Sequence, residues 1–211
     1  MKYYMSISSR AKRKILEGSE TRDTTVSPEH PPLTCYRYSD DIVRSSWKHE
    51  QNRVQPYPTI GVADGIAFSC SNTEKPQPSM RFMFQELEDT VYKDGYTHDP
   101  DLKRWSNQGV LMLNTAFTTT ITKIGVHYEL WQPLMAFILD TLAIKHSGLV
   151  YVFMGKVAKG WSEHVPESNY KLFTTHPASA SHQKIEKWDS GDVFNKINDL
   201  TYKQFKEKII W

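Results

Sequence analysis

The fold of this chain is decided by a short run, GVLMLN, at residues 109–114. Five nearly continuous apolar residues that end in a polar side chain are typical of a strand buried on both faces of a parallel sheet. Two further runs of this kind follow, at residues 149–154 and 171–175. We therefore expect three buried strands in the second half of the chain.

The segments between and after these runs have helical spacing. Residues 131–144 are predicted to form a helix because several apolar or neutral positions share one stripe, namely Leu134, Phe137, Ile138, Thr141 and Leu142. A last helix is predicted over residues 194–200. Alternation of strands with helices indicates an α/β domain with a parallel sheet. Ligands in such sheets bind beyond the carboxyl ends of the strands, where Asn114, Gly155 and His176 stand.

The composition of the whole chain limits its class, its domain organisation and its possible ligands. Its 211 residues, 39% of them hydrophobic, suit one globular domain, and the net charge of +2 neither requires nor excludes nucleic acid. Residues 1–53 are polar and irregular, so we expect a divergent or flexible N-terminal region before a folded domain at 54–211. Nothing suggests a membrane span, a metal site or a cofactor. We expect a monomer in a cytoplasmic, nucleoid or host-cell DNA compartment.

Five segments, in order, resemble the uracil-DNA glycosylase family. They are QPYP (55–58) with GIAFS (65–69), PSM (78–80) with Glu86-Leu87, Trp105 with QGVLMLN (108–114), FMGKVA (153–158) and HPAS (176–179). The Pro-Tyr-Pro turn is similar to that of viral members. The resemblance implies a central four-stranded, mostly parallel sheet between helical layers. It also implies hydrolysis of the N-glycosidic bond of a flipped uracil, which leaves an abasic site in DNA.

The resemblance also implies roles for individual residues. Asn114 would pair with the edge of uracil, since one carboxamide offers both a donor and an acceptor. Phe68 would stack on the base, and Tyr57 would exclude a methyl group at the pyrimidine 5 position. His176 would donate a hydrogen bond to the oxygen that gains negative charge. The DNA strand would be contacted at Pro78, Ser79, Lys156, Ser179 and Ala180.

The sequence departs from the family where catalysis needs a carboxylate. Gln55 stands in place of the family's aspartate, so it can hold a water but offers no charge to a cationic sugar. Asp64, in the same loop, is a candidate substitute. Residues 46–54 lack the pattern of the expected first strand. Ala180 replaces the family's intercalating leucine, which predicts weaker action on duplexes than on single strands.

Three functions therefore remain open. The first is uracil excision, and the second is excision of another or modified pyrimidine, against which Tyr57 and Asn114 count. The third is a catalytically weakened DNA-binding or replication-partner protein on the same fold, which Gln55 and Ala180 favour. Partners would be DNA and, in addition, a replication or inhibitor protein.

Overall fold

The computed structural model describes residues 61–73, 75–93, 95–120 and 125–211. Gln55, Tyr57 and the predicted N-terminal region at 1–53 lie outside the described residues. In the part of the chain that is described, no helix is long and apolar enough to cross a membrane.

The sheet is made of two parallel strands, β1 (Val150–Met154) and β2 (Tyr170–Thr174). Their register pairs Val150 with Tyr170 and Met154 with Thr174. The crossover contains α6 (Lys156–Gly160) and the 3₁₀ turn η2 (Trp161–His164). The strands predicted at 149–154 and 171–175 are thus confirmed to within one residue, as is the α/β class with a parallel sheet.

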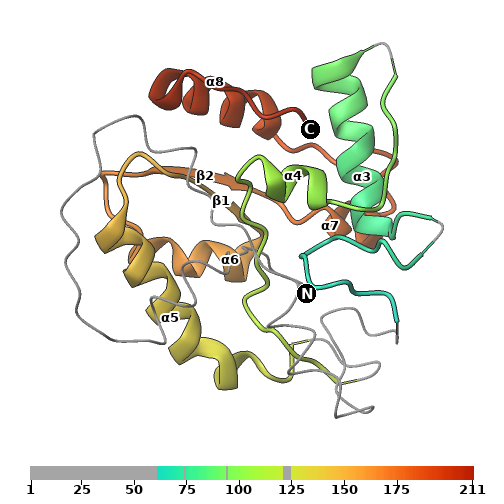
Figure 1. Cartoon of the computed structure of the whole chain (residues 1–211). Coiled ribbons are helices and arrows are strands. Elements are labelled where there is room, and N and C mark those ends of the chain that lie inside the picture. Colours follow the sequence, from blue (N-terminus) through green and yellow to red (C-terminus); the bar gives the residue numbers. More distant parts are fainter. Residues whose placement is uncertain (1–60, 74, 94, 121–124) are drawn as a thin grey trace.

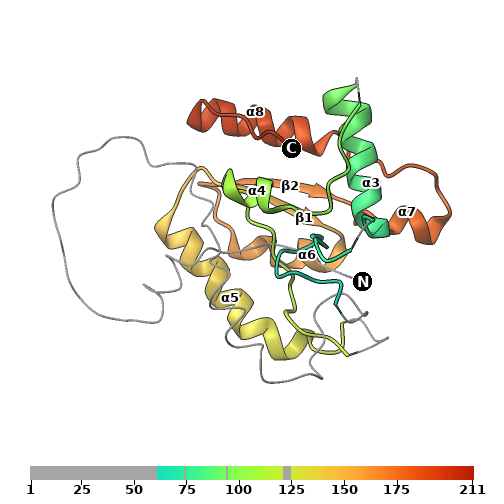
Figure 2. The ribbon, with the colours of Figure 1, turned by 45° about the vertical axis from the view of Figure 1, so that its right-hand side comes forward.

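Helices cover both faces of this sheet (Figures 1 and 2). On one face, α5 (Tyr128–Lys145) and α6 enclose Tyr151 and Phe153 of β1. On the other face lie α3 (Pro78–Leu87), the π-helical turn η1 (Glu88–Tyr92), α4 (Lys103–Asn107) and α8 (Val193–Phe205). The short α7 (Ala178–Gln183) follows β2 beyond its carboxyl end.

Helix α5 is longer than predicted and is turned about its axis. Ile138 and Leu142 of the predicted stripe are buried, but Leu134 is 40% and Phe137 48% exposed. The inward stripe is completed instead by Met135 and Leu139. The sequence located the helix correctly, but which apolar residues face inward is decided by the surface against which the helix packs.

The run at residues 109–114 does not form the predicted strand. Met112 and Leu113 are buried, yet the described residues contain only two of the four strands that the resemblance implies. A cavity of about 150 Å³, bordered by Val110, Met112 and Val152 among others, lies between this run and β1. The prediction of burial was right, but this run forms no strand with any of the described residues. A strand also needs a neighbouring backbone within hydrogen-bond reach.

Candidate functional site

A groove of about 830 Å³ opens at the carboxyl ends of β1 and β2. It is lined by five residues that separate motifs had predicted to bind base or DNA: Pro78, Ser79, Lys156, His176 and Ser179. They come from the first turn of α3, the start of α6 and the segment that leads from β2 into α7. Residues up to 101 positions apart in the sequence (78 to 179) are brought together here, because parallel strands end at the same edge.

The tautomer of His176 follows from a local hydrogen bond. The backbone N–H of Ala178 donates to His176 Nδ1 at 3.0 Å, so this nitrogen acts as an acceptor and carries no proton. A neutral imidazole then keeps its proton on Nε2. The protein thereby presents His176 as a donor through Nε2, which is the form that the predicted role requires.

Phe68 lies next to His176, with the two ring centroids 5.7 Å apart and the planes tilted by 36°. Its φ of 66° is in the left-handed region, which is unusual for a residue with a bulky side chain. Backbone strain of this kind costs on the order of 1–3 kcal/mol and persists only where the surroundings enforce it. The loop at residues 64–71 must therefore be held firmly.

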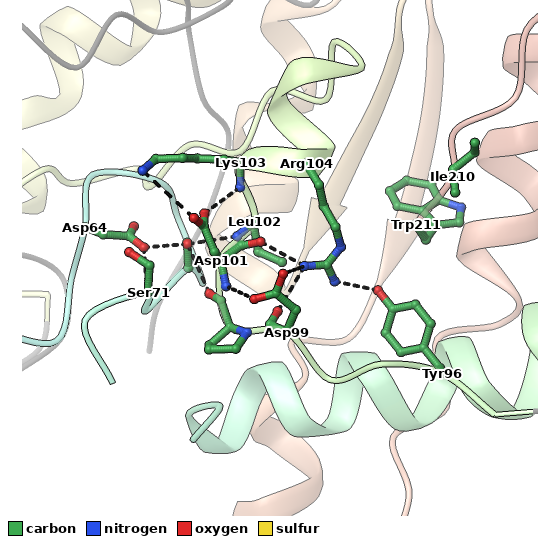
Figure 3. Close-up of polar contacts among 12 residues, drawn as sticks. Asp64, Ser71, Tyr96, Asp99, Asp101, Leu102, Lys103, Arg104, Ile210 and Trp211 are labelled. Atoms are coloured by element: carbon green, nitrogen blue, oxygen red, sulfur yellow. Dashed lines mark hydrogen bonds and ion pairs between the residues drawn. The ribbon is translucent and has the colours of Figure 1, made fainter. Parts of the chain in front are cut away.

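Asp64 provides much of that hold (Figure 3). Its carboxylate accepts hydrogen bonds from Ser69 Oγ at 2.6 Å, from the Ser71 N–H at 2.8 Å and from the Ile66 N–H at 3.2 Å. Ser69 Oγ in turn accepts the Leu102 N–H at 3.1 Å. The geometry favours a positioning role for Asp64, and the predicted role as substitute for the missing catalytic carboxylate stays a prediction.

The segment against which this loop rests is fixed by Arg104, a residue that sequence reasoning missed. Its guanidinium donates to the carbonyl oxygen of Asp101 at 2.8 Å and to Tyr96 Oη at 2.7 Å, and it pairs with Asp99 at 3.2 Å (Figure 3). Burial raises the pKa of Tyr96 above its ordinary value. The only signal in the sequence was the pair of aspartates, Asp99 and Asp101, that precedes the arginine.

Asn114 and Ala180 stand apart from the groove lining. Asn114 Oδ1 is buried and has no hydrogen-bond partner among the described residues. An unsatisfied buried acceptor costs about 1–3 kcal/mol, so a ligand donor at this atom would be favourable. Ala180 is only 3% exposed and packs in the core. Its predicted contact with DNA stays a prediction.

The fold is that of an α/β protein. Its site presents the imidazole ring of His176, a hydrogen-bond donor, in a basic groove. No family model matches the chain. The uracil-DNA glycosylase of Mesomycoplasma hyopneumoniae is 30% identical over 158 residues, which are 74% of this chain and 70% of the relative. The chain belongs to the uracil-DNA glycosylase family. The predicted enzyme class, a DNA glycosylase, is confirmed at the level of that family.

Two other comparisons agree. The uracil-DNA glycosylase of Aliarcobacter butzleri is 28% identical over 74% of this chain and 73% of its own length. The crystal structure of mimivirus uracil-DNA glycosylase superposes with a TM-score of 0.66 at 26% identity and covers 75% of this chain. This chain spans 65% of the mimivirus chain.

Proposed function

We propose that this chain hydrolyses the N-glycosidic bond of uracil flipped out of DNA and leaves an abasic site. The observation that carries the proposal is the Ala178–His176 hydrogen bond, which sets an Nε2 donor beside the Phe68 ring. The same histidine lines a groove together with Lys156. Family membership supports the reaction, and the local geometry supports the assignment of roles.

The chemistry of the base side needs no acid stronger than a neutral imidazole. As the glycosidic bond breaks, the electron pair leaves with the base, and negative charge gathers on a carbonyl oxygen of the uracil. A preorganised donor aimed at that charge contributes about 10²–10³ in rate, which is the part assigned to His176. The buried Asn114 Oδ1 would accept an N–H of the uracil edge, and that contact discriminates against cytosine, which lacks this proton.

The sugar side depends on Gln55, outside the described residues. Its amide can orient the attacking water, but it cannot offset positive charge on the sugar. The lost Coulombic stabilisation is expected to slow the reaction by about two to three orders of magnitude. Tyr57, two residues after Gln55, would exclude the methyl group of thymine from the base pocket.

DNA is the proposed partner, in a cytoplasmic, nucleoid or host-cell DNA compartment. An inhibitor protein is a further candidate partner, because a solved structure of a mimivirus UNG variant, 25% identical to this chain, is in complex with UGI. We propose that the chain acts as a monomer.

The decisive experiment compares wild type with Gln55→Asp under single-turnover conditions on a uracil-containing oligonucleotide. We expect slow release of uracil by wild type and a gain of about 10²–10³ in the variant. Gln132→Asp, an exposed position on α5, adds the same charge away from the groove and should leave the rate unchanged. If neither wild type nor Gln55→Asp releases uracil when enzyme is in excess over DNA, the proposed function is wrong.

A further inference from the structure

The groove contains an aromatic side chain that the proposed reaction does not use. Phe173 of β2 is 49% exposed and lines the same groove as His176 and Lys156. Isolated exposed apolar residues are common on protein surfaces and need no explanation by themselves. Phe173 differs because of what supports it, what stands beside it and where it lies.

The ring of Phe173 is supported by an aromatic side chain of the neighbouring strand. In the parallel register it is paired with Phe153 of β1, and the two rings stack with centroids 5.6 Å apart and planes 22° from parallel. Phe153 is only 2% exposed, stacks in turn on Tyr151 and is buried against Ala158 of α6. Phe173 is thus the outer member of a row of three rings, and it is held rigidly with part of its surface open to the groove.

A cation stands over the same ring. Lys159 Nζ, from α6, lies 5.6 Å from the Phe173 centroid. Lys156 lies one helical turn earlier and also lines the groove. Among the described residues that line the groove there is no carboxylate, so its charge complements a polyanion.

We propose that Phe173 is a stacking platform for an unpaired nucleobase next to the flipped uracil, with Lys159 and Lys156 on the adjoining phosphates. Bases in a duplex already stack on their neighbours, so only a single strand can lay a base face on this ring. The platform thus contributes to the binding of single strands and not to that of duplexes. This step rests on the proposed function for the position of the uracil, but binding to the platform itself requires no uracil.

The platform is tested by binding of uracil-free DNA, measured by fluorescence anisotropy with an oligothymidylate and with a duplex of equal length. Loss of one stacked base weakens binding by about 5- to 150-fold, so we expect Phe173→Ala to lose affinity in that range for the single strand. The duplex affinity should change less than about twofold. Phe173→Leu keeps apolar packing on Phe153 but has no aromatic face, so it should lose the same affinity while remaining folded. Phe173→Tyr should retain binding.

The chain offers a matched control. Tyr202 on α8 is 51% exposed and has two lysines, Lys206 and Lys208, each 5.7 Å from its ring centroid, but it does not line the groove. Tyr202→Ala should bind single strands as wild type does. Lys159→Gln should reduce the slope of log affinity against log salt by about 0.7 for the single strand, as expected for one lost phosphate contact.

Two results would overturn the platform: unchanged single-strand binding in Phe173→Leu, or equal losses for single strand and duplex. In either case the open ring is left as a contact for a protein partner. Uracil release is assayed in parallel so that the two proposals can fail separately. Release without Phe173-dependent binding removes the platform and keeps the glycosylase. Phe173-dependent binding without uracil release, even in Gln55→Asp, removes the glycosylase and keeps the platform.

Discussion

Two segments of this chain share a sequence pattern but have different structures. Residues 170–174 form β2, which leads to His176, whereas residues 109–114 end in Asn114 and form no strand. The second run is the more apolar of the two, yet within the described part of the chain the first alone is paired. The difference teaches that apolar character places a segment in the interior, while a strand forms only where a partner backbone is within reach.

The two segments are also held by different forces. β2 is fixed by backbone hydrogen bonds to β1, and the groove is built on that rigid edge. The run at 109–114 is held at its start by side chains, because Gln108 donates to the Ile210 carbonyl at 2.6 Å and accepts the Ile210 N–H at 2.8 Å. The C-terminal residues thus partly substitute for a neighbouring strand.

The largest expected effect comes from removing the anchor of those residues. Trp211 is 5% exposed, and its ring lies 4.9 Å from that of Phe194 and 5.3 Å from that of Trp105. Trp211→Ala should lower the free energy of unfolding by about 3–5 kcal/mol in chemical denaturation. Ile210→Ala, at a neighbouring residue that is 72% exposed, should change it by less than about 0.5 kcal/mol. Similar values for both variants would show that the C-terminus does not hold this side of the molecule.

The groove side is tested through its histidine. His176→Ala removes the Nε2 donor and should slow uracil release by about 10²–10³, which equals about 3–4 kcal/mol, without a matching loss of stability. His182→Ala, an exposed groove-lining change on α7, is the control and should alter the rate by less than about threefold. An equal effect of both would mean that position in the groove, and not the donor, matters.

Hydrogen exchange compares the two segments directly. Amides of β1 and β2 open only with much of the fold, whereas those of residues 111–114 can open locally, so we expect their protection factors to differ by about 100-fold or more. Mass spectrometry of the intact chain, followed by proteolysis, gives both values in one experiment. Equal protection would show that the run at 109–114 does pair in solution.

The smallest effect concerns Glu86 on α3, which accepts a hydrogen bond from Ser190 ahead of α8. Burial raises the pKa of Glu86 above its ordinary value of 4.5. The folded state therefore retains a proton that the unfolded state gives up, so stability falls as pH rises from 4.5 through the raised pKa. Glu86→Gln should remove this part of the decline in thermal midpoint, and exposed Glu163→Gln should leave it. Parallel pH profiles for Glu86→Gln and wild type would contradict the assignment.

Much of the site could be foreseen because its parts are short motifs at strand and helix ends. His176, Lys156 and Ser179 meet in one groove because the ends of parallel strands meet at one edge. Phe173 could not be foreseen, because its importance depends on Phe153 and Lys159, which lie on other elements. Arg104 could not be foreseen either, because its partners are near in the chain but meet its guanidinium only through the turns of the folded loop. Ala180 was placed by sequence position alone, and its burial depends on how α7 packs.

The sequence by itself determined the family, the α/β class and the two paired strands, and it predicted the base-side residues. These follow from local patterns and from motifs that keep their order. Only the tertiary structure decided that the run at 109–114 pairs with no described strand, that α5 turns Met135 and Leu139 inward, and that Phe173 remains open beside Lys159. Pairing, helix rotation and exposure each depend on which surface lies opposite, and a linear pattern does not encode that surface.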